Sequence, residues 1–149
     1  MNEQKILVCI DFANHSKEII LDYLKRSTLY NESKIILFNG VGQVPIFDTF
    51  SVTLTPTQES FESSIREPIL GELENIKNDI QKILPNSKIE TRCVLYPSVK
   101  KAATDIIEEE NIALVIVANE AKGAMDTLFT SSFTDFVIHH SKAAVLVCK

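Results

Sequence analysis

Short apolar runs alternate along this chain with amphipathic stretches. The runs have the length of strands and span residues 5–10, 34–41, 88–95, 113–117 and 143–148, and the first two suit strands that are buried on both faces of a sheet. The stretches between them repeat apolar residues at helical spacing, over residues 16–30, 61–83, 98–110 and 131–140. This alternation predicts an α/β fold, an open parallel sheet covered by helices on both faces.

Individual segments carry further signals. The 88–95 strand is the most polar, which predicts a sheet edge, whereas the 113–117 strand is uniformly apolar and is expected to be central. Pro68 interrupts the long helical pattern, so we expect a kink or a restart near Glu67. Residues 43–58 are rich in turn and breaker residues, which is typical of an excursion outside the core.

Polar residues predict where the helices begin and end. Ser98 is a competent N-cap, and Ser131 and Ser132 are expected to open the last helix, because Ser132 to Asp135 has the spacing of a capping box. The run of glutamates at 108–110 is interpreted as a solvated helix end rather than as a metal or partner site.

Composition narrows the class of protein. A chain of 149 residues with 45% hydrophobic content fits a single domain over residues 1–149. A formal charge of -5 and scattered lysines argue against nucleic-acid binding. The sequence shows neither a secretory signal nor an apolar run long enough to cross a membrane, so we expect a cytoplasmic protein without a membrane partner. Cys9, Cys93 and Cys148 lack metal-type spacing and are expected to be reduced core residues.

Four stretches give the chain a family resemblance: ILVCIDFANHS at 6–16, FNGV at 38–41, YPSVKKAATDIIEEENIALVIVA at 96–118 and SFTDFVIHHSKAAVLVCK at 132–149. Together they resemble the universal stress protein family over nearly the whole chain. The resemblance implies a Rossmann-like sheet of order 3-2-1-4-5, as in adenine nucleotide alpha hydrolase-like proteins. It also implies a homodimer through the last strand, Ala143 to Cys148, whose open apolar edge would otherwise favour aggregation.

The same resemblance implies an adenine-nucleotide site that has lost its glycines. Nucleotide-binding members carry Gly-x2-Gly-x9-Gly-Ser/Thr after the fourth strand, and this chain has Ala118, Ala121, Ser131 and Ser132 at that spacing. Loop glycines allow positive φ and a close approach of backbone amides to phosphate. An alanine forced to positive φ would cost on the order of 1 kcal/mol.

Further residues of this site are implied by resemblance, and they are Ile10, Asp11, Val41, Asn119, Lys122 and Phe133. Four of these residues have an ordinary alternative: Asp11 can cap the first helix, Val41 can simply end a buried strand, and Asn119 and Lys122 can lie in a solvated loop. Ser131 and Ser132 can be an anion site at a helix N-terminus or plain helix caps. Glu120 and Asp126 would repel phosphate unless a divalent cation intervened.

Two hypotheses follow from the resemblance. In the first, the protein is a homodimeric stress-response regulator that associates with a protein partner and binds ATP weakly or not at all. In the second, it binds ATP or AMP with Mg²⁺ and hydrolyses ATP slowly at most.

The residues predict no catalytic or metal site. There is no Walker A or GxGxxG motif, and His15 has no partner at triad spacing. His139 and His140 are adjacent and face different sides of the expected helix, with His140 expected at the edge of the core.

Overall fold

The computed structural model describes residues 3–10, 16–27, 29–41, 58–95, 99–118 and 127–149, and it leaves the side chains of 41, 58–62 and 127–132 undescribed. The elements, in chain order, are β1 (Lys5–Cys9), α1 (Ser16–Arg26), β2 (Lys34–Val41), α2 (Gln58–Ile83), β3 (Lys88–Leu95), α3 (Val99–Glu109), β4 (Leu114–Ala118), α4 (Thr127–His140) and β5 (Ala144–Cys148). Apart from Gln58, which begins α2, the predicted excursion at 43–58 lies outside the described residues.

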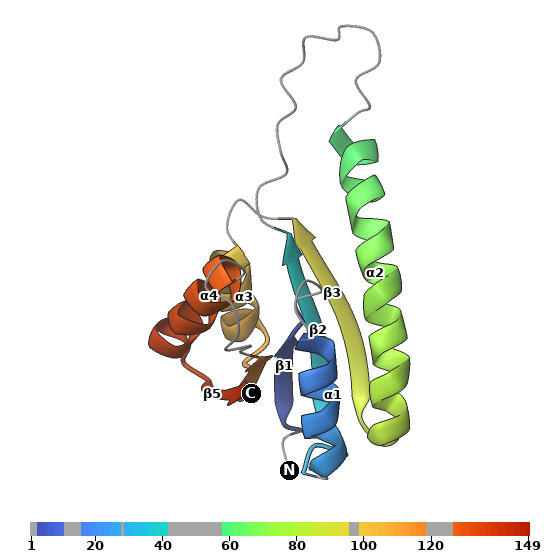
Figure 1. The fold of residues 1–149 in the computed structure, drawn as a ribbon, viewed down its shortest axis with the longest axis vertical. Coiled ribbons are helices and arrows are strands. Elements are labelled where there is room, and N and C mark those ends of the chain that lie inside the picture. Colours follow the sequence, from blue (N-terminus) through green and yellow to red (C-terminus); the bar gives the residue numbers. More distant parts are fainter. Residues whose placement is uncertain (1–2, 11–15, 28, 42–57, 96–98, 119–126) are drawn as a thin grey trace, which may run out of the picture.

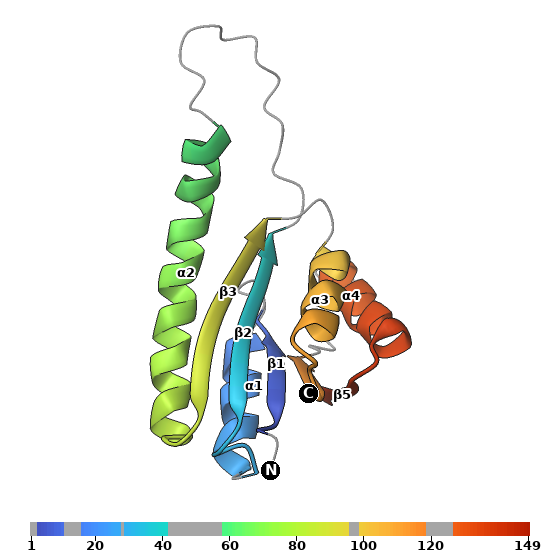
Figure 2. The same cartoon turned by 180° about the vertical axis from the view of Figure 1, so that it is seen from behind.

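The strands form one parallel sheet of order β3-β2-β1-β4-β5. Helices α1 and α2 lie on one face and α3 and α4 on the other, as Figure 1 and the reverse view in Figure 2 show. The predicted fold class and strand order are therefore confirmed. The polar strand β3 is an edge, as predicted, whereas β4 is an interior strand and β1 occupies the centre.

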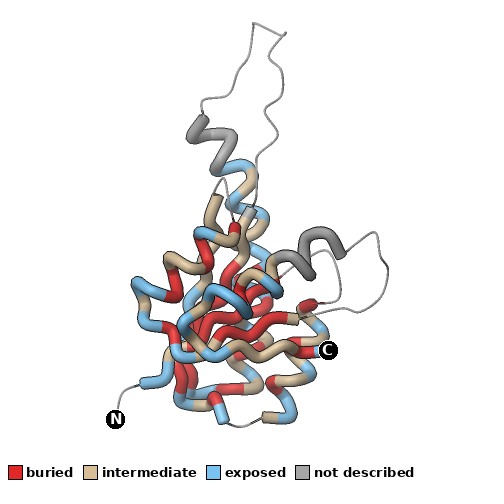
Figure 3. Tube along the Cα trace, turned by 90° about the vertical axis from the view of Figure 1, so that its left-hand side faces the viewer, coloured by how far each residue is buried: buried red, intermediate tan, exposed pale blue. Residues whose placement is uncertain are grey.

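The core has two layers because successive side chains of a strand point to opposite faces of the sheet. Ile6 and Val8 of β1 join the cluster beneath α1 and α2, whereas Leu7 and Cys9 join the cluster beneath α3 and α4. Figure 3 shows the buried segments running through the middle of the molecule between exposed helix faces. This arrangement explains why the interior strands β1 and β4 are continuously apolar rather than alternating.

Helix α2 is continuous, so the restart expected near Glu67 does not occur. Pro68 lies inside this 26-residue helix. Leu73, Ile76 and Ile80 are buried against the sheet, and their packing outweighs the loss of one backbone hydrogen bond at the proline. The N-terminal turns of α2 extend past the end of β3 (Figure 1). No helix in the described part of the chain is long and apolar enough to span a membrane.

Two other helix boundaries differ from expectation. Helix α1 ends at Arg26 rather than near Tyr30, although Tyr30 is still buried. Helix α4 begins at Thr127 rather than at Ser131, one turn earlier. The predicted capping box from Ser132 to Asp135 therefore lies inside the helix. Thr127 belongs to the same class of capping residues, so the signal was ambiguous by a turn.

Helix α3 ends in a Schellman motif. Asn111 has φ of 54°, the Ile112 amide donates to the Ile107 carbonyl at 3.0 Å, and the Asn111 amide donates to the Glu108 carbonyl at 3.3 Å. Asparagine tolerates this left-handed conformation better than most residues. The motif turns the chain directly into β4.

Candidate functional site

A cavity of about 110 Å³ lies at the carboxyl ends of β1, β2 and β4. Its described lining residues are Cys9, Ile10, Ser16, Phe38, Asn39, Gly40, Val99, Val117, Ala118, Phe133 and Thr134. The cavity thus draws on three strands and on the helices α1, α3 and α4.

The strand order explains why a cavity forms at this position. Strand β1 pairs with β2 on one side and with β4 on the other. From β1 the chain continues to β2 on one side of β1, and it later returns to β4 on the other side. The switch point of the sheet therefore lies between β1 and β4. Open parallel sheets bind ligands in the crevice at such a point.

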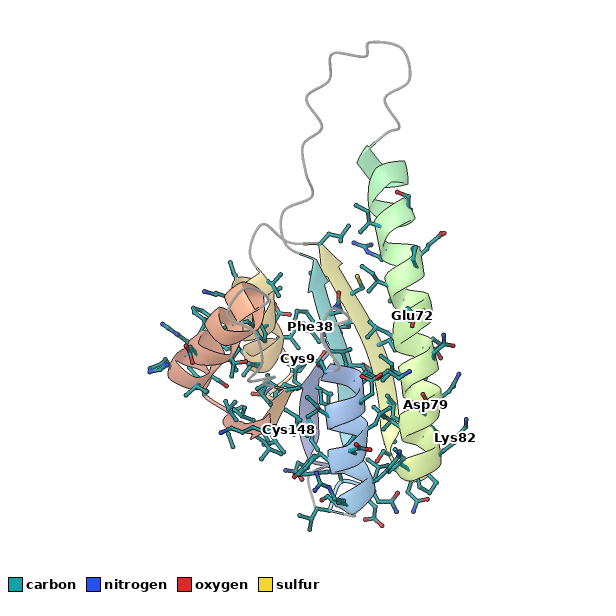
Figure 4. All side chains as sticks on the ribbon, viewed as in Figure 1. Cys9, Phe38, Glu72, Asp79, Lys82 and Cys148 are labelled. Atoms are coloured by element: carbon teal, nitrogen blue, oxygen red, sulfur yellow. The ribbon has the colours of Figure 1, made fainter. Side chains whose placement is uncertain are left out.

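One wall of the cavity is apolar. Cys9 and Phe38 belong to the cluster beneath α3 and α4, and Figure 4 shows both between the central strands and those helices. Val99 comes from the first turn of α3 and reaches close to Gly40. A Cβ added to Gly40 would lie 2.6 Å from Val99 Cγ1, so glycine is required for α3 to pack this closely on β2.

Polar groups enter the cavity lining from three elements. Asn39 Nδ2 donates to the Ile10 carbonyl at 2.8 Å. The Ile10 amide donates to the Phe38 carbonyl at 2.9 Å, so the end of β1 is held to β2 by both a backbone and a side-chain bond. Ser16 at the start of α1 and Thr134 in α4 contribute buried hydroxyl groups.

Among the described lining residues, Cys9 has the only ionisable side chain. Burial raises the pKa of its thiol to about 12. The thiol is therefore protonated at neutral pH and is not an effective nucleophile there. The described lining offers apolar contacts and neutral hydrogen-bonding groups.

The structure brings together three of the ten predicted site residues. Ile10, Ala118 and Phe133 line the same cavity although they are far apart in the sequence. Val41 ends β2, paired with Leu95 of β3, and its side chain is not described. Asp11, Asn119, Ala121 and Lys122 lie outside the described residues.

Two observations concern the residues that were predicted to contact phosphate. Ser131 and Ser132 are the fifth and sixth residues of α4 rather than its first, and amides at these positions donate within a helix. The anion site predicted at these two serines stays a prediction. Ala118 is paired with Cys148 as a strand residue. Among the described non-glycine residues, Asn111 alone has positive φ, so the anticipated backbone strain does not arise at Ala118.

Sequence reasoning missed several lining residues, of which Asn39 and Gly40 are the most informative. Both interrupt the otherwise apolar run of β2 just before its end. A polar residue followed by glycine at the carboxyl end of a buried strand was the available signal, because neither residue strengthens a strand.

The histidines of α4 stand apart from this cavity. His139 and His140 are exposed, and their Nδ1 atoms lie 2.7 Å and 2.9 Å from the carbonyls of Asp135 and Phe136. His140 stacks on Phe136, which packs against the core, with ring centroids 4.2 Å apart, so it contacts the edge of the core although its own side chain is exposed. Within the described ranges, no three His, Cys, Asp or Glu residues are grouped to hold a metal ion.

The family model of the universal stress protein family matches residues 3–149. The chain belongs to the universal stress protein family. No curated protein matches it significantly.

Solved structures share the fold over nearly the full length. Hypothetical protein MJ0577 is 26% identical, with a TM-score of 0.65 and coverage of 100% of this chain and 97% of that one. A universal stress protein in complex with cAMP is 17% identical, with a TM-score of 0.66 and coverage of 99% and 97%. A universal stress protein from Archaeoglobus fulgidus in complex with dAMP is 12% identical, with a TM-score of 0.61 and full coverage of both chains.

Proposed function

We propose that this universal stress protein is a regulatory protein that binds an adenine nucleoside or nucleoside monophosphate weakly at the switch-point cavity. The observation that carries the proposal is the cavity itself, in which Ile10, Ala118 and Phe133 meet beside an apolar wall. Family members of the same fold are described in complex with cAMP and dAMP, which supports an adenine ligand.

The size of the cavity favours the base as the part that is enclosed. Ligand pockets usually measure roughly 300–1,000 Å³, and the cavity between the described residues measures about 110 Å³. This space accommodates a ring system rather than a whole nucleotide. The sugar and any phosphate would extend toward the chain that follows β1 and β4.

The replaced glycines of the loop pattern argue against tight binding of a triphosphate. All three glycines of the family's loop pattern are replaced, by Ala118, Ala121 and Ser131. A Cβ at a loop position hinders the approach of backbone amides to phosphate oxygens. Ser131 also lies inside α4, where its amide is used by the helix. The added phosphates of ATP therefore bring little affinity.

Regulation by binding fits the described lining better than catalysis does. Cys9 is protonated at neutral pH, and the remaining described lining residues have no ionisable side chain. Ligand occupancy would instead fix the ends of β1, β2 and β4 together and so change how the protein associates with a partner.

The test compares adenosine, AMP and ATP, with and without Mg²⁺, by calorimetry and by the melting temperature. We expect adenosine and AMP to bind with dissociation constants on the order of 0.1–1 mM, and ATP with Mg²⁺ to bind no more than about threefold tighter than AMP. The variant Ala118→Leu fills the cavity and should abolish binding. Ala113→Leu makes the same change at an exposed alanine just before β4 and should leave ligand binding intact.

Two outcomes would contradict the proposal. Tenfold or tighter binding of ATP with Mg²⁺ than of AMP would favour a true ATP-binding protein. No detectable binding of any of the three ligands at millimolar concentration would exclude the nucleoside site altogether.

A further inference from the structure

Asn39 is the one side-chain amide among the described lining residues of the cavity. It lies near the carboxyl end of β2, at the strand pair β1 and β2 that borders the switch point. A carboxamide can offer a donor and an acceptor side by side, whereas the hydroxyls of Ser16 and Thr134 each offer a single polar atom. Asn39 is therefore the described lining residue best suited to recognise a ring by its edge.

The contact with Ile10 fixes the orientation of this amide. The two terminal atoms of an asparagine side chain are distinguished only by their hydrogen bonds. The Ile10 carbonyl can only accept, so the atom 2.8 Å from it must be Nδ2. Ile10 is itself held by the bond from its own amide to the Phe38 carbonyl, at 2.9 Å. The partner of Asn39 is thus anchored before any ligand arrives.

This contact leaves a donor and an acceptor of the amide available besides the bond to Ile10. One N–H of Asn39 is committed to Ile10, and the side chain retains its second N–H and its Oδ1, which lie in one plane. An asparagine amide is complementary to the 6-amino group of adenine together with the adjacent ring nitrogen. The apolar groups of Phe38, Val99 and Phe133 in the same cavity suit the faces of a flat ring.

We infer that Asn39 is a specificity-determining residue that reads the amino-bearing edge of the base in this cavity. The inference rests on the proposed function, because it assigns a residue to the recognition of the adenine ring. It goes further in stating that the 6-amino group is the selected feature. Because the bond to Ile10 orients the amide before binding, this recognition requires little reorganisation of the side chain.

The test measures the coupling between one protein group and one ligand group. Adenosine is compared with purine riboside, which lacks only the 6-amino group, on the wild-type protein and on Asn39→Leu. The wild type should bind adenosine roughly three- to tenfold tighter, as expected for one net hydrogen bond. On Asn39→Leu the ratio should fall to about one. Asn86→Leu, at an exposed asparagine before β3, should keep the wild-type ratio.

The ratio is measured on one protein at a time, so a change in overall stability does not imitate the expected result. If Asn39→Leu does not fold, Asn39→Ser replaces it, since its short hydroxyl cannot present an amide edge. A ratio that Asn39 variants leave unchanged, with only a lower melting temperature, would show that Asn39 merely holds the end of β1 and would overturn the inference. Adenosine binding without discrimination by the wild type would overturn it while leaving the proposed function standing. No binding of adenosine would remove both.

Discussion

Gly40 shows how a single residue sets the shape of the cavity. Its missing side chain lets Val99 of α3 approach β2, and a Cβ there would lie 2.6 Å from Val99 Cγ1 and 3.0 Å from Phe38 Cζ. Both neighbours are buried, so neither can move away freely. The close contact between α3 and β2 thus requires a glycine at position 40, where the side chain is a single hydrogen atom.

We predict that Gly40→Ala lowers the free energy of unfolding by about 1–3 kcal/mol through overpacking. Removing methyl groups from Val99 should relieve the clash. The loss in free energy of unfolding of the double variant Gly40→Ala, Val99→Ala should therefore be smaller than the sum of the two single losses, by at least about 1 kcal/mol. Urea denaturation of the four proteins measures this coupling.

Gly71 provides the matched control. An added Cβ there meets nothing within 4 Å, and the residue lies inside α2. Gly71→Ala should therefore stabilise the protein by roughly 0.5–1 kcal/mol. Additive losses for Gly40→Ala and Val99→Ala, or a Gly40→Ala protein as stable as the wild type, would contradict the steric account.

At the scale of residues, the sequence predicted some of the residues that line the cavity but not Asn39 and Gly40. Ile10, Ala118 and Phe133 were accessible because a family pattern marks those positions. Asn39 and Gly40 were not, because their roles depend on a hydrogen bond to Ile10 and on the position of Val99. Such contacts join segments separated by many residues, so the local pattern of a polar residue and a glycine at the end of β2 marks the two positions without showing what they contact.

At the scale of elements, the end of α3 is joined to the sheet by charge. Glu110 follows the helix and pairs with Arg92 of β3 and with Lys5 of β1, at 3.4 Å for the lysine. Its side chain is 21% exposed. The interpretation of the glutamates at 108–110 as a solvated end was thus wrong for Glu110, because the chain folds it onto cations that are remote in sequence.

This pairing predicts a dependence of stability on pH. The hydrogen bond from Arg92 is the main cause that lowers the pKa of the Glu110 carboxyl group, against a smaller opposing effect of burial. A lowered folded-state pKa stabilises the protein above the unfolded-state value of about 4.3, and this stabilisation is lost as the pH falls through the folded-state pKa. We expect Glu110→Gln to lose about 1 kcal/mol at pH 7 and progressively less as the pH falls below about 4.

Chemical denaturation of both proteins at pH 7, 5 and 3 measures this difference. Glu108 supplies the control, because it pairs with Lys142 at 3.0 Å but both side chains are largely exposed. Glu108→Gln should change stability by less than about 0.5 kcal/mol at every pH. A Glu110→Gln loss that stays constant from pH 7 to pH 3 would show that the charge of Glu110 is not its cause.

Element boundaries show the limit of sequence reasoning most clearly. The bounds of β2 and β3 were predicted to the residue, because apolar runs flanked by turn residues are local signals. The start of α4 was missed by a turn, since Thr127 and Ser132 both belong to residue types that cap helices. Of the kink or restart expected near Glu67, the restart does not occur, because packing against the sheet, which the sequence does not display, compensates for the proline.

At the scale of the molecule, β5 leaves one edge of the sheet unpaired within the chain. The Ala144 amide donates to the Ala113 carbonyl, which directs the polar backbone groups of Ala144 toward β4. In a parallel strand these directions alternate from residue to residue. The amides of Val145 and Val147 therefore point to the open edge, and both side chains are half-buried. Such an edge is a template for pairing with another strand.

We predict that the protein is a dimer joined by antiparallel pairing of two β5 strands. Val145→Pro should make it monomeric, because proline removes an outward-facing amide while the Ala144 bond to β4 is kept. Light scattering coupled to size-exclusion chromatography measures the mass, and circular dichroism confirms that the variant is folded.

Leu29→Lys changes the most exposed large apolar side chain of the described residues, at 80%, and should leave the dimer intact. A monomeric wild type would exclude the interface, and so would a folded Val145→Pro variant that dimerises as well as the wild type. A dimer lost on Leu29→Lys alone would place the interface near the end of α1 instead.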